Sequence, residues 1–464
     1  MKEKKTGGFS SSIGFVLSAA GSAVGVGNIW RFPYLAAKDG GGLFIVIYIA
    51  LVLTFGFTLL TTDIAIGRKT GQHATNAYKT MHPKWGFLGK LTFLVPAIIM
   101  TFYSVIGGWV TKYMVTYITF SGAEAAETTY FDDFITSFPS PVIYNLIFLA
   151  ITAVIVYRGV EKGIEKFSKV VMPGLILMVV VIAFFSLTLS YTDAAGTTRT
   201  GMQGLAVYLI PNMEGITFSK FIQILLDAMS QLFFSLSVSK GIMITYGSYV
   251  KKETNLSKSI SQIEIFDTLV ALLAGMMIIP AVYVFMGPDG MTSGVGLMFR
   301  SLPKVFASMG GACNVIGFIF FLMVAFAALT SCVSILETLV ASCMEMFHTS
   351  RQKTCLVITA LTAVASTVVC LGYNVFFFSL TLPNGASAQI LDIMDYVSNS
   401  VLMPFISLLS CIFIGWVVGP NWIAEEMELN GHKFSRKKLY IIMIKYIAPV
   451  LMAILFLQST GILG

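Results

Sequence analysis

The chain has 464 residues, of which 56% are hydrophobic and only 11% are charged, and its mean hydropathy is +0.82. A soluble protein of this length needs far more charge to cover its surface, so the composition indicates a polytopic membrane protein. The net charge of +7 is spread over short loops instead of forming one basic face, which argues against nucleic-acid binding.

Eleven apolar segments of the length that a bilayer requires follow one another along the chain. We expect membrane-spanning helices at 10–36, 42–67, 87–118, 141–157, 168–191, 219–249, 258–286, 314–347, 354–373, 389–418 and 439–459. The six cysteines lack metal-ligand spacing and mostly lie in apolar runs, so we interpret them as buried side chains. The sequence therefore predicts an all-α membrane protein.

The basic residues orient these spans. With the N-terminus in the cytoplasm, the intracellular segments carry 21 lysines and arginines, and the opposite loops carry five. Those five are Lys38, Arg199, Lys220, Arg300 and Lys304. The bias predicts a cell-membrane protein with a cytoplasmic N-terminus and, after eleven spans, an extracellular C-terminus.

Two spans contain residues that weaken a helix at mid-membrane depth. The first holds AAGSAVGVGN (19–28), and the sixth, five spans later, holds SLSVSKG (235–241). The glycines would also suit close packing between helices. A matched pair of interrupted helices, however, predicts two five-helix halves in an inverted-repeat transporter with a site at the midplane.

Three segments carry a family resemblance: GSAVGVGNIWRFPYLAAKDGGG (21–42), QLFFSLSVSKGIMITYGSY (231–249) and AFAALTSCVSILE (325–337). They resemble the first, sixth and eighth helices of the neurotransmitter:sodium symporter family, in its short eleven-helix bacterial form. The resemblance implies a five-plus-five inverted-repeat fold with unwound first and sixth helices, and sodium-coupled uptake of an amino acid by alternating access. We expect one transporter domain over 1–459, with repeats at about 10–191 and 219–418, an extra helix at about 439–459 and an extracellular tail at 460–464.

The resemblance implies two sodium sites built from oxygen atoms, the ligands that a hard cation requires. The first site corresponds to the carbonyl of Ala23 and the side chains of Asn28, Ser235 and Asp267. The second corresponds to the carbonyls of Gly21, Val24 and Ala327 and the hydroxyls of Thr330 and Ser331.

Asp267 carries a charge deep inside its span. It follows Lys258 by nine positions, which is about 13 Å of helix rise. A carboxylate at that depth needs a partner, and we interpret Asp267 as a ligand that compensates sodium directly. In chloride-dependent relatives the site nearby is neutral and chloride supplies the negative charge, whereas other relatives place a carboxylate one turn later, at the position of Ala271 here. Asp267 itself replaces a neutral ligand, so we expect this fixed carboxylate to make chloride unnecessary. A protonated aspartic acid that donates to a carbonyl is the alternative.

The same segments frame the substrate. The residues that the resemblance assigns to its pocket are Ser22, Ala23, Val26, Gly27, Ile99, Tyr103, Phe234, Ser235, Ser237, Lys240, Ser331 and Ile335. Monoamine transporters have an aspartate where this chain has Gly25, so glycine favours a substrate that brings its own carboxylate. Another amine or small zwitterion is the alternative.

Lys240 departs from the family pattern, because relatives place a bulky apolar residue there. A lysine in a partly dry pocket can bind an anionic or polar end of the substrate. Alternatively, its stem extends along the helix and its ammonium group reaches cavity water or Asp267. The sequence leaves both interpretations open.

The gates follow the resemblance as well. Arg31 and Asp395 match an outer ion pair, and Tyr103 and Phe234 match an aromatic lid. At the cytoplasmic side, Lys4 or Lys5 would have to face Tyr249 and Glu345.

An intramembrane enzyme and an ion channel are the two alternatives to a transporter. The four histidines all fall in cytoplasmic segments, so we expect no intramembrane enzyme. An ion channel would have no use for an amino acid pocket. We expect the lipid bilayer and a small-molecule substrate as partners, and no obligatory protein partner is evident.

Overall fold

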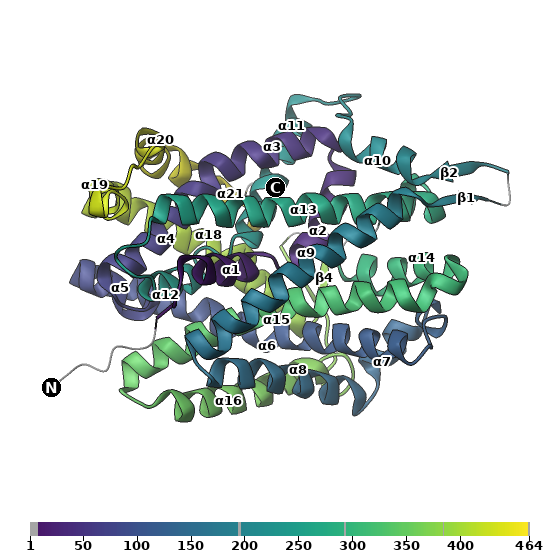
Figure 1. The fold of residues 1–464 in the computed structure, drawn as a ribbon, viewed down its shortest axis with the longest axis horizontal. Helices are drawn as coiled ribbons and strands as arrows, with labels where there is room; N and C mark the ends of the chain where they lie inside the picture. The colour runs from purple at the N-terminus through teal and green to yellow at the C-terminus, as the bar shows by residue number, and fades with distance from the viewer. Residues whose placement is uncertain (1–7, 194–195, 292–293, 384, 463–464) are drawn as a thin grey trace.

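The computed structural model describes residues 8–193, 196–291, 294–383 and 385–462, and helices make up most of them (Figure 1). Within these residues there are two short antiparallel hairpins, β1 (Ser190–Thr192) with β2 (Thr198–Thr200) and β3 (Leu380–Thr381) with β4 (Ser387–Ala388). The long helices run along the longest axis of the molecule, and the β1–β2 hairpin projects from one end (Figure 1).

Nine helical segments of the described chain are long and apolar enough to cross a membrane. They contain α3 (Gly42–Leu51) with α4 (Phe57–Thr70), α6 (Gly86–Ile118), α8 (Ser140–Tyr157), α9 (Lys166–Leu187), α13 (Leu256–Met286), α15 (Cys313–Phe347), α16 (Arg351–Leu371), α17 (Ile390–Asp395) with α18 (Met403–Ile412), and α20 (Lys437–Ile442) with α21 (Ala448–Ser459).

The two remaining predicted spans are broken. The first consists of α1 (Ser12–Ala23) and α2 (Val26–Lys38), which together pass the same test for a span and are bent by 54° relative to each other. The sixth is divided between α11 (Phe218–Ser235) and α12 (Ile242–Ser248), neither of which qualifies alone. All eleven predicted spans thus coincide with helices. The fifth ends earlier than expected, because residues 190–192 favour an extended backbone and pair with β2.

Short helices gather at the two ends of the bundle. Figure 1 shows α5 (Ala74–Met81) and α19 (Asn421–Met427) near α12 at one end. At the opposite end lie α7 (Tyr130–Thr136), α10 (Gly201–Leu209) and α14 (Leu302–Ser308).

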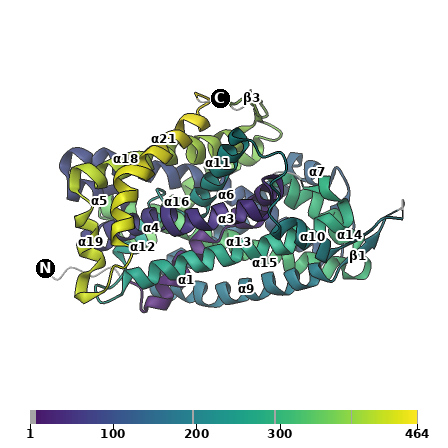
Figure 2. The same ribbon diagram turned by 90° about the horizontal axis from the view of Figure 1, so that it is seen from above.

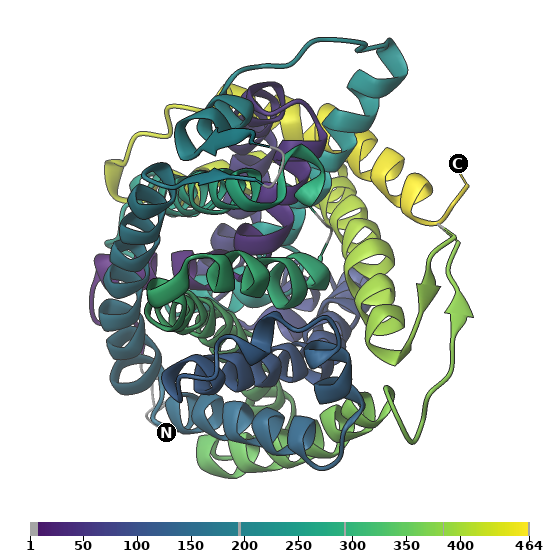
Figure 3. The ribbon, with the colours of Figure 1, turned by 90° about the vertical axis from the view of Figure 1, so that its right-hand side faces the viewer.

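The spans divide into central and peripheral helices. The most apolar stretches around α6 and α15 are 78% and 83% buried, whereas those of α8, α16 and the α20–α21 segment are only 33% buried. Figure 3 looks along the long helices of the bundle. In Figure 2, α9 and α21 lie toward opposite edges. Exposed apolar side chains on the peripheral helices, such as Leu356 and Val450, give a surface that suits lipid.

Local signals explain where several helices begin and end. The side chains of Ser11, Thr217 and Asn255 accept hydrogen bonds from backbone amides in the first turns of α1, α11 and α13. Gly71 ends α4 with a φ of 63°, a left-handed conformation that glycine adopts without steric cost. Polar caps therefore fix the entry of both broken spans.

The unwound segment between α11 and α12 has an unusual backbone. Ser237 and Ser239 have φ angles of 54° and 58°, which residues with a Cβ rarely adopt, and Gly241 follows at 73°. Neighbouring helices hold this conformation: the amide of Ser239 donates to Asp63 Oδ2 at 2.9 Å, and the hydroxyl of Ser237 donates to the Ser22 carbonyl at 2.9 Å. The two broken spans are thus tied together at their breaks.

Helices α4 and α12 cross at two glycines. A Cβ on Gly67 would lie 1.9 Å from the carbonyl oxygen of Ile244, and one on Gly247 would lie 2.3 Å from that of Ile64. Because both obstacles are backbone atoms, we expect Gly67→Ala to destabilise the protein by about 1–3 kcal/mol. The measurement is the apparent Tm in detergent. Gly174→Ala on α9 is the control, since nothing lies within 4 Å of its Cβ position. Equal Tm values for the two variants would contradict this close crossing.

Candidate functional site

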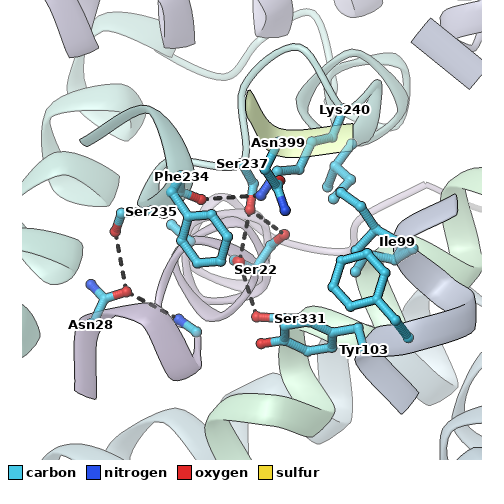
Figure 4. Close-up of a pocket in the computed structure, with 15 residues that line it drawn as sticks. Ser22, Asn28, Ile99, Tyr103, Phe234, Ser235, Ser237, Lys240, Ser331 and Asn399 are labelled. Carbon is cyan, nitrogen blue, oxygen red and sulfur yellow. Dashed lines mark hydrogen bonds between the residues drawn. The ribbon is translucent and has the colours of Figure 1, made fainter. Parts of the chain in front are cut away.

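A small cavity lies between the breaks of the two interrupted spans (Figure 4). Its lining residues are Ser22, Ala23, Gly25, Asn28, Ile99, Phe102, Tyr103, Phe234, Ser235, Ser237, Lys240, Ile242, Ser331, Ile335 and Asn399. Ten of the twelve residues predicted for the substrate pocket are among them. The other two, Val26 and Gly27, are buried beside the cavity and do not line it.

The cavity is small. Its volume is about 30 Å³, which is on the scale of one or two water molecules, so an amino acid enters only after side chains move. Phe234 also lines a second, larger cavity of about 380 Å³, together with Arg31 and Asp395. A Cβ on Gly27 would lie 2.4 Å from the Phe234 ring, so this ring lies directly across the start of α2. Phe234 therefore separates the inner cavity from an outer vestibule.

Asp267 gathers the predicted ligands of the first sodium site. Its Oδ1 accepts hydrogen bonds from Asn28 Nδ2 at 2.8 Å and from Ser235 Oγ at 2.7 Å. Tyr48 donates to Oδ2 at 3.5 Å. The side chain is fully buried, and no lysine, arginine or histidine of the described chain lies within 4 Å of it. A buried carboxylate with neutral neighbours alone is strongly unfavourable, so this cluster suits a bound cation.

The predicted residues of the second sodium site meet where α1 ends beside α15. Thr330 Oγ1 donates to the Ala327 carbonyl at 3.0 Å, and Ser331 Oγ donates to the Ser22 carbonyl at 3.2 Å. A Cβ on Gly21 would lie 3.3 Å from Thr330, so the two helices approach closely at this level. The arrangement brings hydroxyl and carbonyl oxygens together without a formal charge.

The break in the first span lies close to Tyr103 and Ser331, because Gly25 has no side chain. A Cβ on Gly25 would lie 3.0 Å from Ser331 Oγ and 3.2 Å from the Tyr103 hydroxyl. The amide of Val26 donates to that hydroxyl at 3.4 Å. A side chain at position 25 would therefore fill a polar corner of the cavity.

Lys240 remains inside the cavity. The residue is 7% exposed, and its Nζ donates to the Phe234 carbonyl at 3.1 Å (Figure 4). The same nitrogen lies 4.9 Å from the centre of the Phe234 ring. It makes no ion pair with Asp267, which was one of the two places expected for an ammonium group on an extended stem. The other place, cavity water, stays a prediction.

The predicted outer pair is close but not in contact. Arg31 donates to Ser230 Oγ at 2.7 Å and lies 5.6 Å from the centre of the Phe234 ring. Asp395 accepts a hydrogen bond from Asn399 Nδ2 at 2.6 Å. The two charges interact electrostatically without forming a salt bridge.

At the end of the bundle where α5 and α12 lie, Tyr249 bonds to a carboxylate that was not among the predicted gate residues. Its hydroxyl donates to Glu337 Oε1 at 2.6 Å, and Arg351 forms an ion pair with the same carboxylate. Glu345 instead accepts a hydrogen bond from the amide of His73 at 3.2 Å. Lys4 and Lys5 lie outside the described residues. Tyr249, His73 and Arg351 border a cavity of about 700 Å³. Burial lowers the pKa of His73 to about 4, so this ring is neutral at physiological pH.

Three polar residues of this region were not predicted from the sequence. Asp63 holds the unwound segment through Ser239, Asn399 lines the cavity, and Glu337 forms an ion pair with Arg351. Asp63 and Glu337 are carboxylates within apolar spans, a signal that could have identified them. Asn399 gives no such signal, because its role depends on where α17 and α18 lie.

We expect the Arg351–Glu337–Tyr249 cluster to close this end of the protein, since Tyr249 and Arg351 line the cavity of about 700 Å³. We expect Glu337→Gln to lower the free energy of unfolding by an amount near the lower end of about 3–5 kcal/mol, because Arg351 keeps its charge but is partly exposed.

We also expect Glu337→Gln to speed the thiol labelling of a cysteine introduced by Ala341→Cys, since Ala341 borders this cavity. Arg158→Gln, another lining residue, is the control for both measurements. Unchanged labelling would show that the cluster does not close this end.

The sequence matches a family model described as the sodium:neurotransmitter symporter family over residues 6–133 and 131–462. It is 34% identical to the sodium-dependent transporter YhdH of Bacillus subtilis, with all of both chains covered. It is 24% identical to the sodium- and chloride-dependent GABA transporter 2 of Mus musculus, over 92% of this chain and 75% of that protein.

A similar solved structure is that of MhsT in complex with L-phenylalanine. The two chains have a TM-score of 0.83 and 32% sequence identity, and the match covers 98% of this chain and 99% of MhsT. Identity and fold agree over the whole length, which confirms the predicted fold class. The chain is therefore a member of the sodium:neurotransmitter symporter family, a sodium-dependent membrane transporter and not an enzyme.

Proposed function

We propose that this protein carries an amino acid into the cell together with sodium, and that it does so by alternating access without a need for chloride. The observation that carries the proposal is the fully buried carboxylate of Asp267 between Asn28 and Ser235, beside the breaks in both interrupted spans.

Asp267 supports both the sodium coupling and the independence from chloride. A sodium ion ligated by Asp267, Asn28, Ser235 and the Ala23 carbonyl would supply the positive charge that this carboxylate lacks. The fixed negative charge then compensates the charge of the sodium ion, as an added chloride ion would in a neutral site. Ala271, one turn later on α13, is apolar and buried, so no second carboxylate competes for that position.

The polar corner at Gly25 supports an amino acid as the substrate. The substrate carboxylate would lie beside Tyr103 and Ser331, at the place that a side chain at position 25 would fill. The L-phenylalanine in the MhsT complex supports the same class of substrate. The second sodium ion would bind among the oxygens of Gly21, Val24, Ala327, Thr330 and Ser331, which would hold α1 against α15.

Alternating access follows from closures on both sides of the cavity. Phe234 lies between the cavity and the vestibule, with Arg31 and Asp395 ready to close above it. The Arg351–Glu337–Tyr249 cluster closes the other side. The corresponding breaks, five spans apart, support repeats at about 10–191 and 219–418. The distribution of lysines and arginines supports an N-terminus in the cytoplasm and a C-terminus outside.

Replacing Asp267 with asparagine tests the proposal. We expect Asp267→Asn to lower the apparent sodium affinity at least about tenfold, because a neutral amide leaves the ion less well compensated, or to create a dependence on chloride. The measurement is sodium-dependent uptake in proteoliposomes, in chloride and in gluconate. Glu264→Gln is a matched control on the same helix, since Glu264 pairs with Arg436 away from the cavity. Loss of wild-type uptake in gluconate would refute the charge argument.

The outer closure is tested separately. Arg31→Ala should leave sodium-dependent binding measurable while slowing net transport several-fold, because the site loads but is not sealed. Binding is followed by thermal stabilisation and transport by uptake into proteoliposomes. Wild-type turnover in Arg31→Ala would show that Arg31 is not part of a gate.

A further inference from the structure

The inner cavity contains one charged side chain among the described residues that line it, that of Lys240. With only 7% of the residue exposed, its ammonium group is almost completely removed from water. A lysine in this position requires compensation from its surroundings, since desolvation of an unpaired ammonium is costly.

The protein supplies only partial compensation. Of the three N–H donors of the ammonium, one bonds to a side-chain or backbone acceptor of the described chain, the carbonyl of Phe234. That carbonyl belongs to the last turn of α11, where the helix dipole is negative, and the Phe234 ring adds a weaker attraction. No described carboxylate lies within 4 Å of Nζ, so two donors remain for a ligand.

One carboxylate of the vestibule acts on both cations. Asp395 interacts electrostatically with Lys240 and Arg31, and it forms an ion pair with neither. Asp392 lines the vestibule, not the inner cavity, and accepts a hydrogen bond from the amide of Gln389. Lys240 therefore has no carboxylate of the described chain in contact with it.

We propose that Lys240 determines the substrate class by binding a carboxylate on the substrate side chain, so that the transported amino acid is acidic. This inference rests on the proposed function. Figure 4 shows Lys240 and Asn399 well away from Asn28 and Tyr103, so the two ends of the substrate have separate polar partners. The α-carboxylate lies at the Tyr103 end, and the side-chain carboxylate reaches the ammonium group.

The energetic argument is a comparison between two ligands. A side-chain carboxylate forms charge-assisted hydrogen bonds with the ammonium and supplies the missing countercharge. An isobutyl group in the same place supplies neither and removes the remaining water from Lys240. Ser237 and Asn399 extend the polar side of the cavity, and Ile99 and Ile335 accommodate the methylene groups.

The experiment compares ligands of equal shape and different charge. Thermal stabilisation of the purified full-length protein is titrated with glutamate, glutamine, aspartate, asparagine and leucine, in sodium and in potassium. We expect the wild type to bind each acid at least about tenfold more tightly than its amide, and only in sodium. Lys240→Met, which keeps an unbranched side chain that is one atom shorter and uncharged, should reverse that order and gain affinity for leucine. Lys240→Arg should keep the preference for acids. Lys304→Met removes a charge outside the cavity and should change nothing.

Each other outcome overturns a specific statement. A wild type that binds leucine or glutamine as tightly as glutamate refutes the inference, even if Lys240→Met does not fold. The same order of affinities for the five amino acids in the wild type and in Lys240→Met also refutes the inference. If binding in that case still depends on sodium, the proposed function stands. If sodium-dependent binding is absent for every amino acid, the proposed function itself fails.

Discussion

The buried carboxylate of Asp267 is the constraint on which the rest of the site depends. It draws Asn28 from α2 and Ser235 from the end of α11 to one helix, α13, and thereby joins both broken spans at their breaks. Neutral donors reduce the cost of burying this charge but do not cancel it. A monovalent cation at the same place would cancel it, and removing that cation would leave the two breaks less firmly connected. Binding of a cation at Asp267 and the geometry of the cavity would therefore depend on each other.

The unwound segments have a second requirement, since their backbone groups cannot be left unpaired inside a membrane. Between α11 and α12, two serines adopt positive φ angles that cost conformational energy, and Asp63 and Ser22 stabilise them by hydrogen bonds. Strain in this segment is thus supported by α4 and α1, which belong to the same half of the chain. A regular helix would have needed none of these contacts, but it would also have exposed no carbonyl groups to the cavity.

The charged groups lie at three separate places. The vestibule contains Arg31 and two aspartates, the cavity contains Lys240, and the Glu337–Arg351 pair lies beside the cavity of about 700 Å³. Asp395 interacts electrostatically with Arg31 and Lys240 and forms an ion pair with neither, so the vestibule and the cavity share one carboxylate.

The sequence by itself determined the eleven spans and the two breaks, because hydropathy and glycine clusters are visible in short stretches of chain. Most of the cavity residues were expected from the resemblance to the symporter family, and ten of those twelve line the cavity. The tertiary structure alone decided which distant groups meet. Lys240 bonds to the Phe234 carbonyl, Tyr249 bonds to Glu337 and not to Glu345, and Asn399 enters the cavity. These contacts depend on the rotation and bending of whole helices, which arise from packing along their full lengths, and no local pattern encodes them.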